Sequence, residues 1–147
     1  MVSAKYTWRE DAQVLYCEGN KLHSKPIPVP MKPIKLVKNR SDIGAGTRGS
    51  DMGIDAVEIA AINAGNDYFT RFKFVDLDSD NESVYNKVKA KFAKRIAFVV
   101  EQCERVCTGV KETLDQGCFP IVLSGDHSSA LGTISGIKAQ YPNKRLG

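Results

Sequence analysis

Short apolar segments alternate with helical segments through most of this chain, and that alternation limits the fold more than any other feature. Residues 34–37, 72–77 and 119–123 have the composition of strands. Helices are predicted at residues 55–64 and 129–140, and a much longer helix lies between them. Strand–helix–strand units form parallel sheets with helices packed on the faces. We therefore predict an α/β fold, with an open, mostly parallel sheet flanked by helices.

The longest predicted helix rests on a single apolar stripe. Apolar residues recur there at intervals of three and four, and Gly117 provides a stop. The members of the stripe are Val84, Val88, Phe92, Ile96, Val99, Cys103, Val106, Val110 and Leu114. We expect one amphipathic helix over this whole span, with the intervening lysines on its solvated face.

Two stretches divide the chain. Residues 1–33 end in a run that holds Pro26, Pro28, Pro30 and Pro33. Prolines at this density exclude a helix or a central strand, so we predict an N-terminal extension or proline-rich lead-in. Residues 34–147 carry the α/β pattern, and Leu146-Gly147 resembles the first step of a fourth strand. Because domain boundaries normally fall in exposed linkers, we expect a truncated α/β domain.

Charge and cysteine content narrow the functional class. The formal charge is +4 and the basic residues are scattered, so we expect neither nucleic acid nor a membrane as a partner. No apolar stretch approaches the roughly 18–20 residues of a membrane span, and the N-terminus lacks a signal-peptide core. The cysteines show no disulfide spacing, and Cys103 and Cys107 share one helix face. We predict a soluble, reduced, cytoplasmic protein.

The residues after the apolar run 119–123 are the strongest candidate for chemistry. Ser124-Gly125-Asp126-His127-Ser128 follows a predicted strand and precedes a helix, and ligands in open α/β sheets lie beyond the carboxyl ends of strands. Imidazole is the commonest protein ligand of transition metals, so His127 is a candidate metal ligand. Asp126 could orient His127, bind the metal directly, or cap the helix that follows. His127 could also be a hydrogen-bonded residue of a capped turn.

Gly44-Ala45-Gly46-Thr47-Arg48-Gly49 fits the pattern G-x-G-x-x-G of dinucleotide-binding loops. That function requires the pattern to follow a strand directly and to open a helix. Here several residues separate the motif from the strand before it and from the helix after it. A constrained glycine-rich loop near a site is the better interpretation, and a nucleotide-binding module remains a minor alternative.

Taken together, these residues resemble the ureohydrolase superfamily, which includes arginase, agmatinase and formimidoylglutamase. Residues 120–128 and the small residues of 130–136 are similar to the first metal motif, Gly-Gly-Asp-His-Ser with a small-residue helix. Residues 44–56 resemble the early glycine-rich loop. Two positions depart from the pattern: Ser124 replaces the first glycine of the metal motif, and Ile54 replaces a usual proline. The resemblance runs from about residue 34 to 147.

The resemblance implies a two-manganese site at the carboxyl edge of the sheet, with two histidines and four aspartates as ligands. Only His127 has a counterpart among those ligands, and Asp126 corresponds to the aspartate that supports it from behind. The Asp-x-His-x-Asp motif and the later Asp-x-Asp pair do not occur in this sequence. No catalytic residue and no substrate-binding residue is therefore assigned here.

The expected function is that of the N-terminal portion of a Mn²⁺-dependent hydrolase, most like arginase, which converts arginine to ornithine and urea. The substrate class is a small guanidino or formimino compound, and we expect a homo-oligomer. The 147 residues alone are expected to be inactive. The main alternative is a truncated or pseudoenzyme product that acts by subunit association through an unpaired strand edge.

Overall fold

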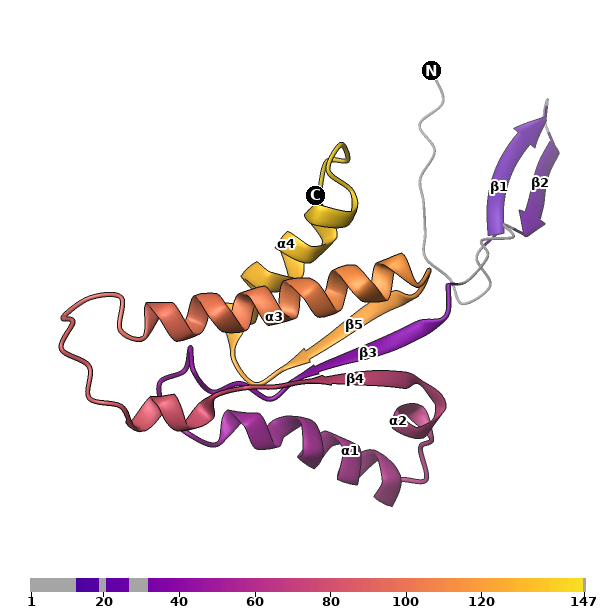
Figure 1. Cartoon of the computed structure of the whole chain (residues 1–147). Coiled ribbons are helices and arrows are strands. Elements are labelled where there is room, and N and C mark those ends of the chain that lie inside the picture. Colours follow the sequence, from indigo (N-terminus) through magenta and orange to yellow (C-terminus); the bar gives the residue numbers. More distant parts are fainter. Residues whose placement is uncertain (1–12, 19–20, 27–31, 147) are drawn as a thin grey trace. The chain divides into compact units, whose positions relative to one another are not determined.

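The computed structural model describes residues 13–18, 21–26 and 32–146 (Figure 1). The chain divides into two compact units, Met1–Met31 and Lys32–Gly147. In the first unit, β1 (Gln13–Glu18) and β2 (Lys21–Pro26) pair as antiparallel strands. We predicted no strand within residues 1–33, so this hairpin departs from the prediction. Pro26 is the last residue of β2, and most of the proline-rich run lies outside the described residues.

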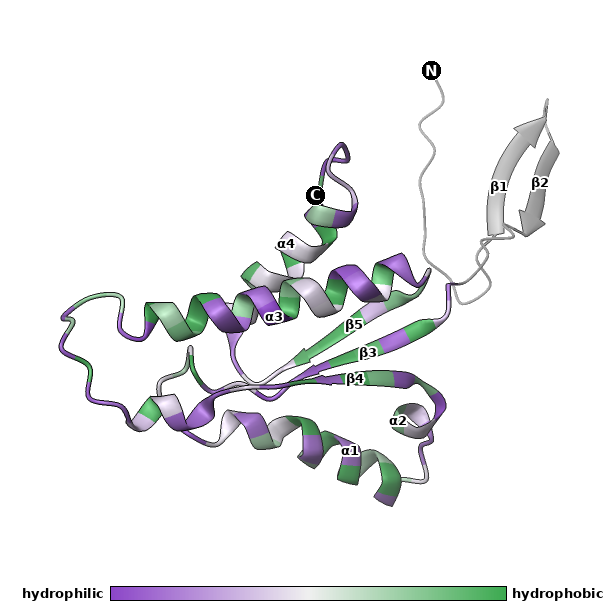
Figure 2. Cartoon of the chain, viewed as in Figure 1, coloured by the Kyte–Doolittle hydropathy of each residue, from purple (hydrophilic) through white to green (hydrophobic). Residues whose placement is uncertain are grey.

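The second unit contains a parallel three-stranded sheet, as the sequence predicted. Its strands are β3 (Ile34–Asn39), β4 (Lys73–Leu77) and β5 (Phe119–Ser124), in the order β4-β3-β5. The register pairs Asn39 with Leu77 on one side and with Ser124 on the other. All three strands therefore end at the same edge of the sheet. Figure 2 shows that hydrophobic residues dominate β5.

Helices cover both faces of this sheet (Figure 1). They are α1 (Gly53–Asn63), α2 (Tyr68–Arg71), α3 (Ile96–Asp115) and α4 (Ala130–Gln140). On the α1 face, the buried Lys38 of β3 forms an ion pair with the partly exposed Glu58. On the α3 face, Val37 lies so close to Gly109 that a Cβ there would be 3.6 Å from the valine side chain. The fold class is thus confirmed, and alternate residues of β3 face opposite helices.

The prediction of one long helix is wrong over the first third of its span. The structure has a short 3₁₀ turn at Asn81–Tyr85, then irregular chain, and α3 begins only at Ile96. Ala93 and Arg95 both have positive φ, which ends any continuous helix there. Lys87, Lys91 and Arg95 would repel one another at i, i+4 spacing and oppose the helix dipole. Arg95 instead donates a hydrogen bond to the Val84 carbonyl, 2.8 Å away.

The middle of the stripe is buried as predicted, whereas Ile96 at the start of α3 is 57% exposed. Cys103, Val106 and Val110 are buried, and the chain turns after α3 at Gly117 with φ +74°. Helix α4 packs closely on α3, because Gly132 and Gly136 meet the carbonyls of Cys103 and Cys107. A Cβ at position 136 would lie 2.6 Å from the Cys107 carbonyl oxygen. Glycines spaced four apart therefore let the two backbones approach each other.

Two further predictions concern a fourth strand at the end of the chain and the length of its apolar segments. Leu146 lies in no strand, and Gly147 lies outside the described residues, so the predicted start of a fourth strand is not seen at Leu146. Among the helices of the described segments, none combines the length and the apolar character that crossing a bilayer requires.

Candidate functional site

The candidate site is built where β3 and β5 end side by side. Asn39 and Ser124 are register partners and the last residues of their strands. The chain leaves β3 through the glycine-rich loop and leaves β5 through the turn that carries Asp126 and His127. The parallel register thus brings together two motifs that lie far apart in the sequence, and a hydrogen bond joins them across 82 positions.

Asp126 is the residue that shapes the turn. It caps the short 3₁₀ segment His127–Ser129, because its Oδ1 accepts the backbone N–H of Ser128 at 2.9 Å. Its Oδ2 accepts the backbone N–H of Gly44 at 3.1 Å. The capping role was one of three that the sequence left open for Asp126. Both carboxylate oxygens are therefore engaged by the protein.

His127 is exposed, in contrast to the buried serine two residues later. Its side chain lines a groove of about 610 Å³ between β5 and α4. The groove is also lined by Pro120, Val122, Ser124, Gly125, Asp126, Ser129, Ala130, Thr133 and Ile134. An exposed imidazole at the head of a groove is available to bind a ligand from solution.

Two glycines permit this close approach of loop and turn. A Cβ at Gly44 would lie 2.6 Å from Asp126 Oδ1, and a Cβ at Gly125 would lie 2.6 Å from the Ser41 carbonyl oxygen. Separations under about 3 Å are not tolerated between such atoms, so larger side chains would push the two segments apart. The glycine-rich loop is therefore constrained against the site, as the sequence predicted.

A buried polar network supports the turn from the sheet side. Gln102 of α3 donates through Nε2 to Asn39 Oδ1 at 2.7 Å, and Asn39 Nδ2 donates to Ser124 Oγ at 3.1 Å. Ser124 Oγ and Ser129 Oγ lie within hydrogen-bond distance of each other and of the Asp126 carbonyl oxygen. Sequence reasoning missed Asn39, Gln102 and Ser129, since isolated polar residues in strands and helices give no pattern.

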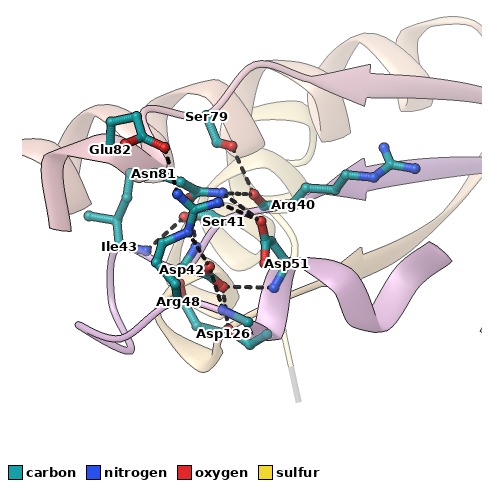
Figure 3. Close-up of polar contacts among 12 residues, drawn as sticks. Arg40, Ser41, Asp42, Ile43, Arg48, Asp51, Ser79, Asn81, Glu82 and Asp126 are labelled. Atoms are coloured by element: carbon teal, nitrogen blue, oxygen red, sulfur yellow. Dashed lines mark hydrogen bonds and ion pairs between the residues drawn. The ribbon is translucent and has the colours of Figure 1, made fainter. Parts of the chain in front are cut away.

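Asp42 organises the loop itself (Figure 3). Its side chain is fully buried, and its two oxygens accept the backbone N–H groups of Gly49 at 3.0 Å and Asp51 at 2.7 Å. The hydroxyl of Ser50 also donates to it. Burial alone would raise the pKa of Asp42, but the hydrogen bonds from Ser50, Gly49 and Asp51 outweigh burial and hold that pKa below its ordinary value.

Arg48 ties the loop to its surroundings. Its guanidinium contacts Asp42, Asp51 and Glu82 at 3.1, 3.1 and 2.7 Å. The hydrogen bonds to these carboxylates raise the pKa of Arg48 and keep it charged, and the bond to Glu82 has the largest effect. The backbone N–H groups of Gly49 and Asp51 already donate to the carboxylate of Asp42, so these loop amides are bonded within the loop itself. That arrangement gives no support to the nucleotide-binding alternative for Gly44–Gly49.

The residues present fit part of a metal site. Across the described ranges, no group of three or more histidine, cysteine or acidic side chains is placed to hold a metal ion. His127 offers one exposed imidazole, and both carboxylate oxygens of Asp126 already accept hydrogen bonds from the protein. Within the described residues, this site offers one exposed imidazole, and further metal ligands would have to come from other chain segments.

Known proteins resemble the chain over the region just described. The model of the arginase family matches residues 33–147. Arginase of Bacillus caldovelox is 29% identical over 126 residues, which cover 80% of this chain and 39% of the relative. Arginase of Brevibacillus brevis is 32% identical over 118 residues, covering 76% of this chain and 38% of the relative.

Solved structures give the same result. A crystal structure of arginase from Bacillus subtilis has a TM-score of 0.54 at 26% identity, covering 75% of this chain and 34% of that one. The native arginase structure from Bacillus caldovelox has a TM-score of 0.54 at 28% identity, covering 74% and 37%. The chain therefore spans about two fifths of the length of the curated relatives it matches.

Proposed function

The chain belongs to the arginase family, and we propose that it supplies one metal-binding edge of a Mn²⁺-dependent hydrolase that acts on a guanidino substrate. The curated relatives are arginases, which supports the conversion of arginine to ornithine and urea as the reaction of the whole enzyme. A formimino compound is the other substrate class consistent with the motif. Cys103, Cys107 and Cys118 are free thiols, which supports a reducing, cytoplasmic location.

One observation carries the proposal: His127 is exposed at the carboxyl end of β5 while Asp126 is engaged by both neighbouring segments. The imidazole would bind a metal ion through a ring nitrogen. Asp126 would fix the turn and thereby the direction of the His127 side chain. Oxygen-rich sites that include imidazole suit Mn²⁺, and the missing oxygen ligands would come from further aspartates.

The chemistry that divalent ions would supply at the completed site is water acidified enough to act as a nucleophile at ordinary pH. The residues of this chain would position the groups around the metal. The glycine-rich loop closes against Asp126 through Gly44, and the groove beside β5 leaves space next to His127. The chain brings one of the six ligands that the family pattern requires, so hydrolysis is proposed for the whole enzyme.

Sequencing the coding DNA beyond the Gly147 codon is the first test. The proposal predicts an open frame that runs into Asp-x-His-x-Asp, and an unrelated sequence there would refute it. In the polypeptide that holds both motifs, His127→Ala should lower Mn²⁺ affinity and urea release by at least about tenfold with the melting temperature retained. Assays on arginine, agmatine and formimidoylglutamate then separate the substrate classes.

A second candidate function is subunit association through β5. This strand forms one edge of the sheet, and Phe119 at its start is 56% exposed. Leu131 and Ile134 of α4 are also exposed. Among the described residues no strand pairs with the outer side of β5, and such an edge with exposed apolar side chains invites pairing with another chain. Light scattering over a concentration series should then show oligomers, and a monodisperse monomer would argue against this function.

A further inference from the structure

We propose that Ser124 is a positioning residue that holds the Asp126–His127 turn in one conformation through its hydroxyl group. The proposal rests on the proposed role of His127 in metal binding, and it adds a residue that this role requires. Ser124 stands where the resembled motif has glycine, so the hydroxyl is a feature of this chain rather than of the pattern.

The hydroxyl lies at the end of a chain of buried polar groups. Asn39 is fully buried and Gln102 is 3% exposed. Gln102 Nε2 donates both to Asn39 Oδ1 at 2.7 Å and to the Asp78 carbonyl oxygen at 3.1 Å. The side-chain amide of Asn39 is thereby oriented with its oxygen toward α3 and its nitrogen toward β5. The nitrogen then needs an acceptor on β5, and Ser124 Oγ provides it at 3.1 Å.

Counting donors and acceptors shows what the hydroxyl does next. Ser124 accepts from Asn39 and has one hydrogen to donate. That hydrogen goes either to the Asp126 carbonyl oxygen or to Ser129 Oγ, which itself lies 2.8 Å from the same carbonyl. In both arrangements, the Asp126 carbonyl accepts one hydroxyl and Asn39 is satisfied. The backbone on the amino side of His127 is therefore tied to the buried core of the sheet.

This tie acts in concert with the contacts of the Asp126 side chain. The Asp126 carbonyl is held by the serine pair, and its carboxylate is held by Gly44 and Ser128. The peptide unit that leads into His127 is thus fixed at both ends. Removal of the Ser124 hydroxyl would leave the buried Asn39 nitrogen without its partner. The Asp126 carbonyl would keep only the hydroxyl of Ser129, and the turn would lose its link to the buried amides of the sheet.

Ser124→Ala is the direct test, because it removes the hydroxyl without adding the backbone freedom of glycine. The measurement is backbone amide hydrogen exchange by NMR on the metal-free 147-residue chain. The amides of Gly44 and Ser128 report on the Asp126 side chain, and those of Val106 and Val110 report on global opening. We expect the Gly44 and Ser128 amides to exchange at least about fivefold faster relative to the core amides.

Ser124→Thr is the matched control, since it keeps the hydroxyl at an exposed position where a methyl group has room. It should restore the exchange ratio to within about twofold of the parent chain. An unchanged ratio in Ser124→Ala, or a loss in both variants alike, would overturn the proposal.

A second measurement links the turn to metal binding. In the polypeptide that also holds Asp-x-His-x-Asp, Mn²⁺ alone is titrated while the His127 imidazole resonances are followed for paramagnetic broadening, and it should act at lower concentration on the parent than on Ser124→Ala. If amide exchange accelerates but Mn²⁺ broadens no imidazole resonance in either form of that polypeptide, the proposed function fails while the positioning role of Ser124 stands. If Mn²⁺ binds both chains equally and exchange is unchanged, the positioning role fails while the proposed function stands.

Discussion

The Asp126 carboxylate accepts a hydrogen bond from the backbone N–H of Gly44, 3.1 Å away and 82 positions earlier in the chain. This contact joins the loop after β3 to the turn after β5, and it is possible only because position 44 has no side chain. The two motifs that the sequence singled out separately therefore form one structure. A substitution at either end of the contact should disturb both motifs.

Gly44→Ala should destabilise the chain by about 2 kcal/mol, because the new Cβ would collide with Asp126 and Ser128. Gly53→Ala is the matched control: Gly53 has helical backbone angles, and a Cβ added there would meet nothing within 4 Å. It should stabilise by about 0.5 kcal/mol. Urea denaturation followed by circular dichroism measures both, and equal effects would contradict the close approach at Gly44.

Asp126→Ala and His127→Ala should differ in stability although the residues are adjacent. Asp126→Ala removes the cap and the bond to Gly44 and should cost about 1–2 kcal/mol. His127 is exposed, so His127→Ala should change stability by no more than about 0.5 kcal/mol. Thermal unfolding of the metal-free chain measures the pair. A large loss in His127→Ala would mean that the imidazole is a structural residue.

Asp42 should make the chain sensitive to acid. Its pKa is below the ordinary value in the folded state, so its contribution to stability is complete above about pH 4, the unfolded value. The contribution is lost as the pH falls through the lower folded value. Unfolding free energies measured from about pH 6 downward should therefore decline below about pH 4.

Two variants isolate the Asp42 effect from that of other carboxylates. Asp42→Asn should cost about 3 kcal/mol at neutral pH, since an amide cannot replace both buried oxygens, and should flatten the acid dependence. Ser50→Ala removes only one hydrogen bond and should cost about 1 kcal/mol with a partial flattening. An acid slope identical in all three chains would exclude Asp42 as its source.

The ion pair between Lys38 and Glu58 should respond differently to loss of either partner. The Lys38 side chain is 3% exposed and the Glu58 side chain 29% exposed, with 2.8 Å between Nζ and Oε2. Glu58→Gln leaves a buried ammonium without its counter-charge and should cost about 3 kcal/mol. Lys38→Met leaves a carboxylate that water can reach and should cost about 1 kcal/mol. The reverse order in chemical denaturation would contradict this burial asymmetry.

The sheet and the turn could be predicted from the sequence because their signals are local. The apolar run 119–123 followed by Asp126-His127 indicates a strand and a functional turn without knowledge of the partner strands. The parallel sheet and the fold class follow from alternation with helices. The matches to arginases confirm the family, whereas the role of His127 as a metal ligand stays a prediction.

The errors have physical causes that periodicity does not report. A stripe with period 3.6 was present from Val84 onward, but repulsion among Lys87, Lys91 and Arg95 disfavours a helix there. The chain breaks instead at the left-handed residues 93 and 95. β1 and β2 were missed because their residues lack a strict alternation, although Gly19-Asn20 between them is a dipeptide typical of hairpins. Asn39 and Gln102 could not be found, since their importance depends on a contact across 63 positions.

The contact between α3 and α4 also limits how the site can move. Gly132 and Gly136 are four residues apart, and so are the two carbonyls of α3 that they meet. A slide of α4 by four residues, about 6 Å, would leave one glycine at these carbonyls and would bring Ser128 or Gln140 to the other. The pair of glycines therefore favours a single position of α4 along α3. Because His127 lies just before α4, that position also restrains where the His127 turn lies relative to α3.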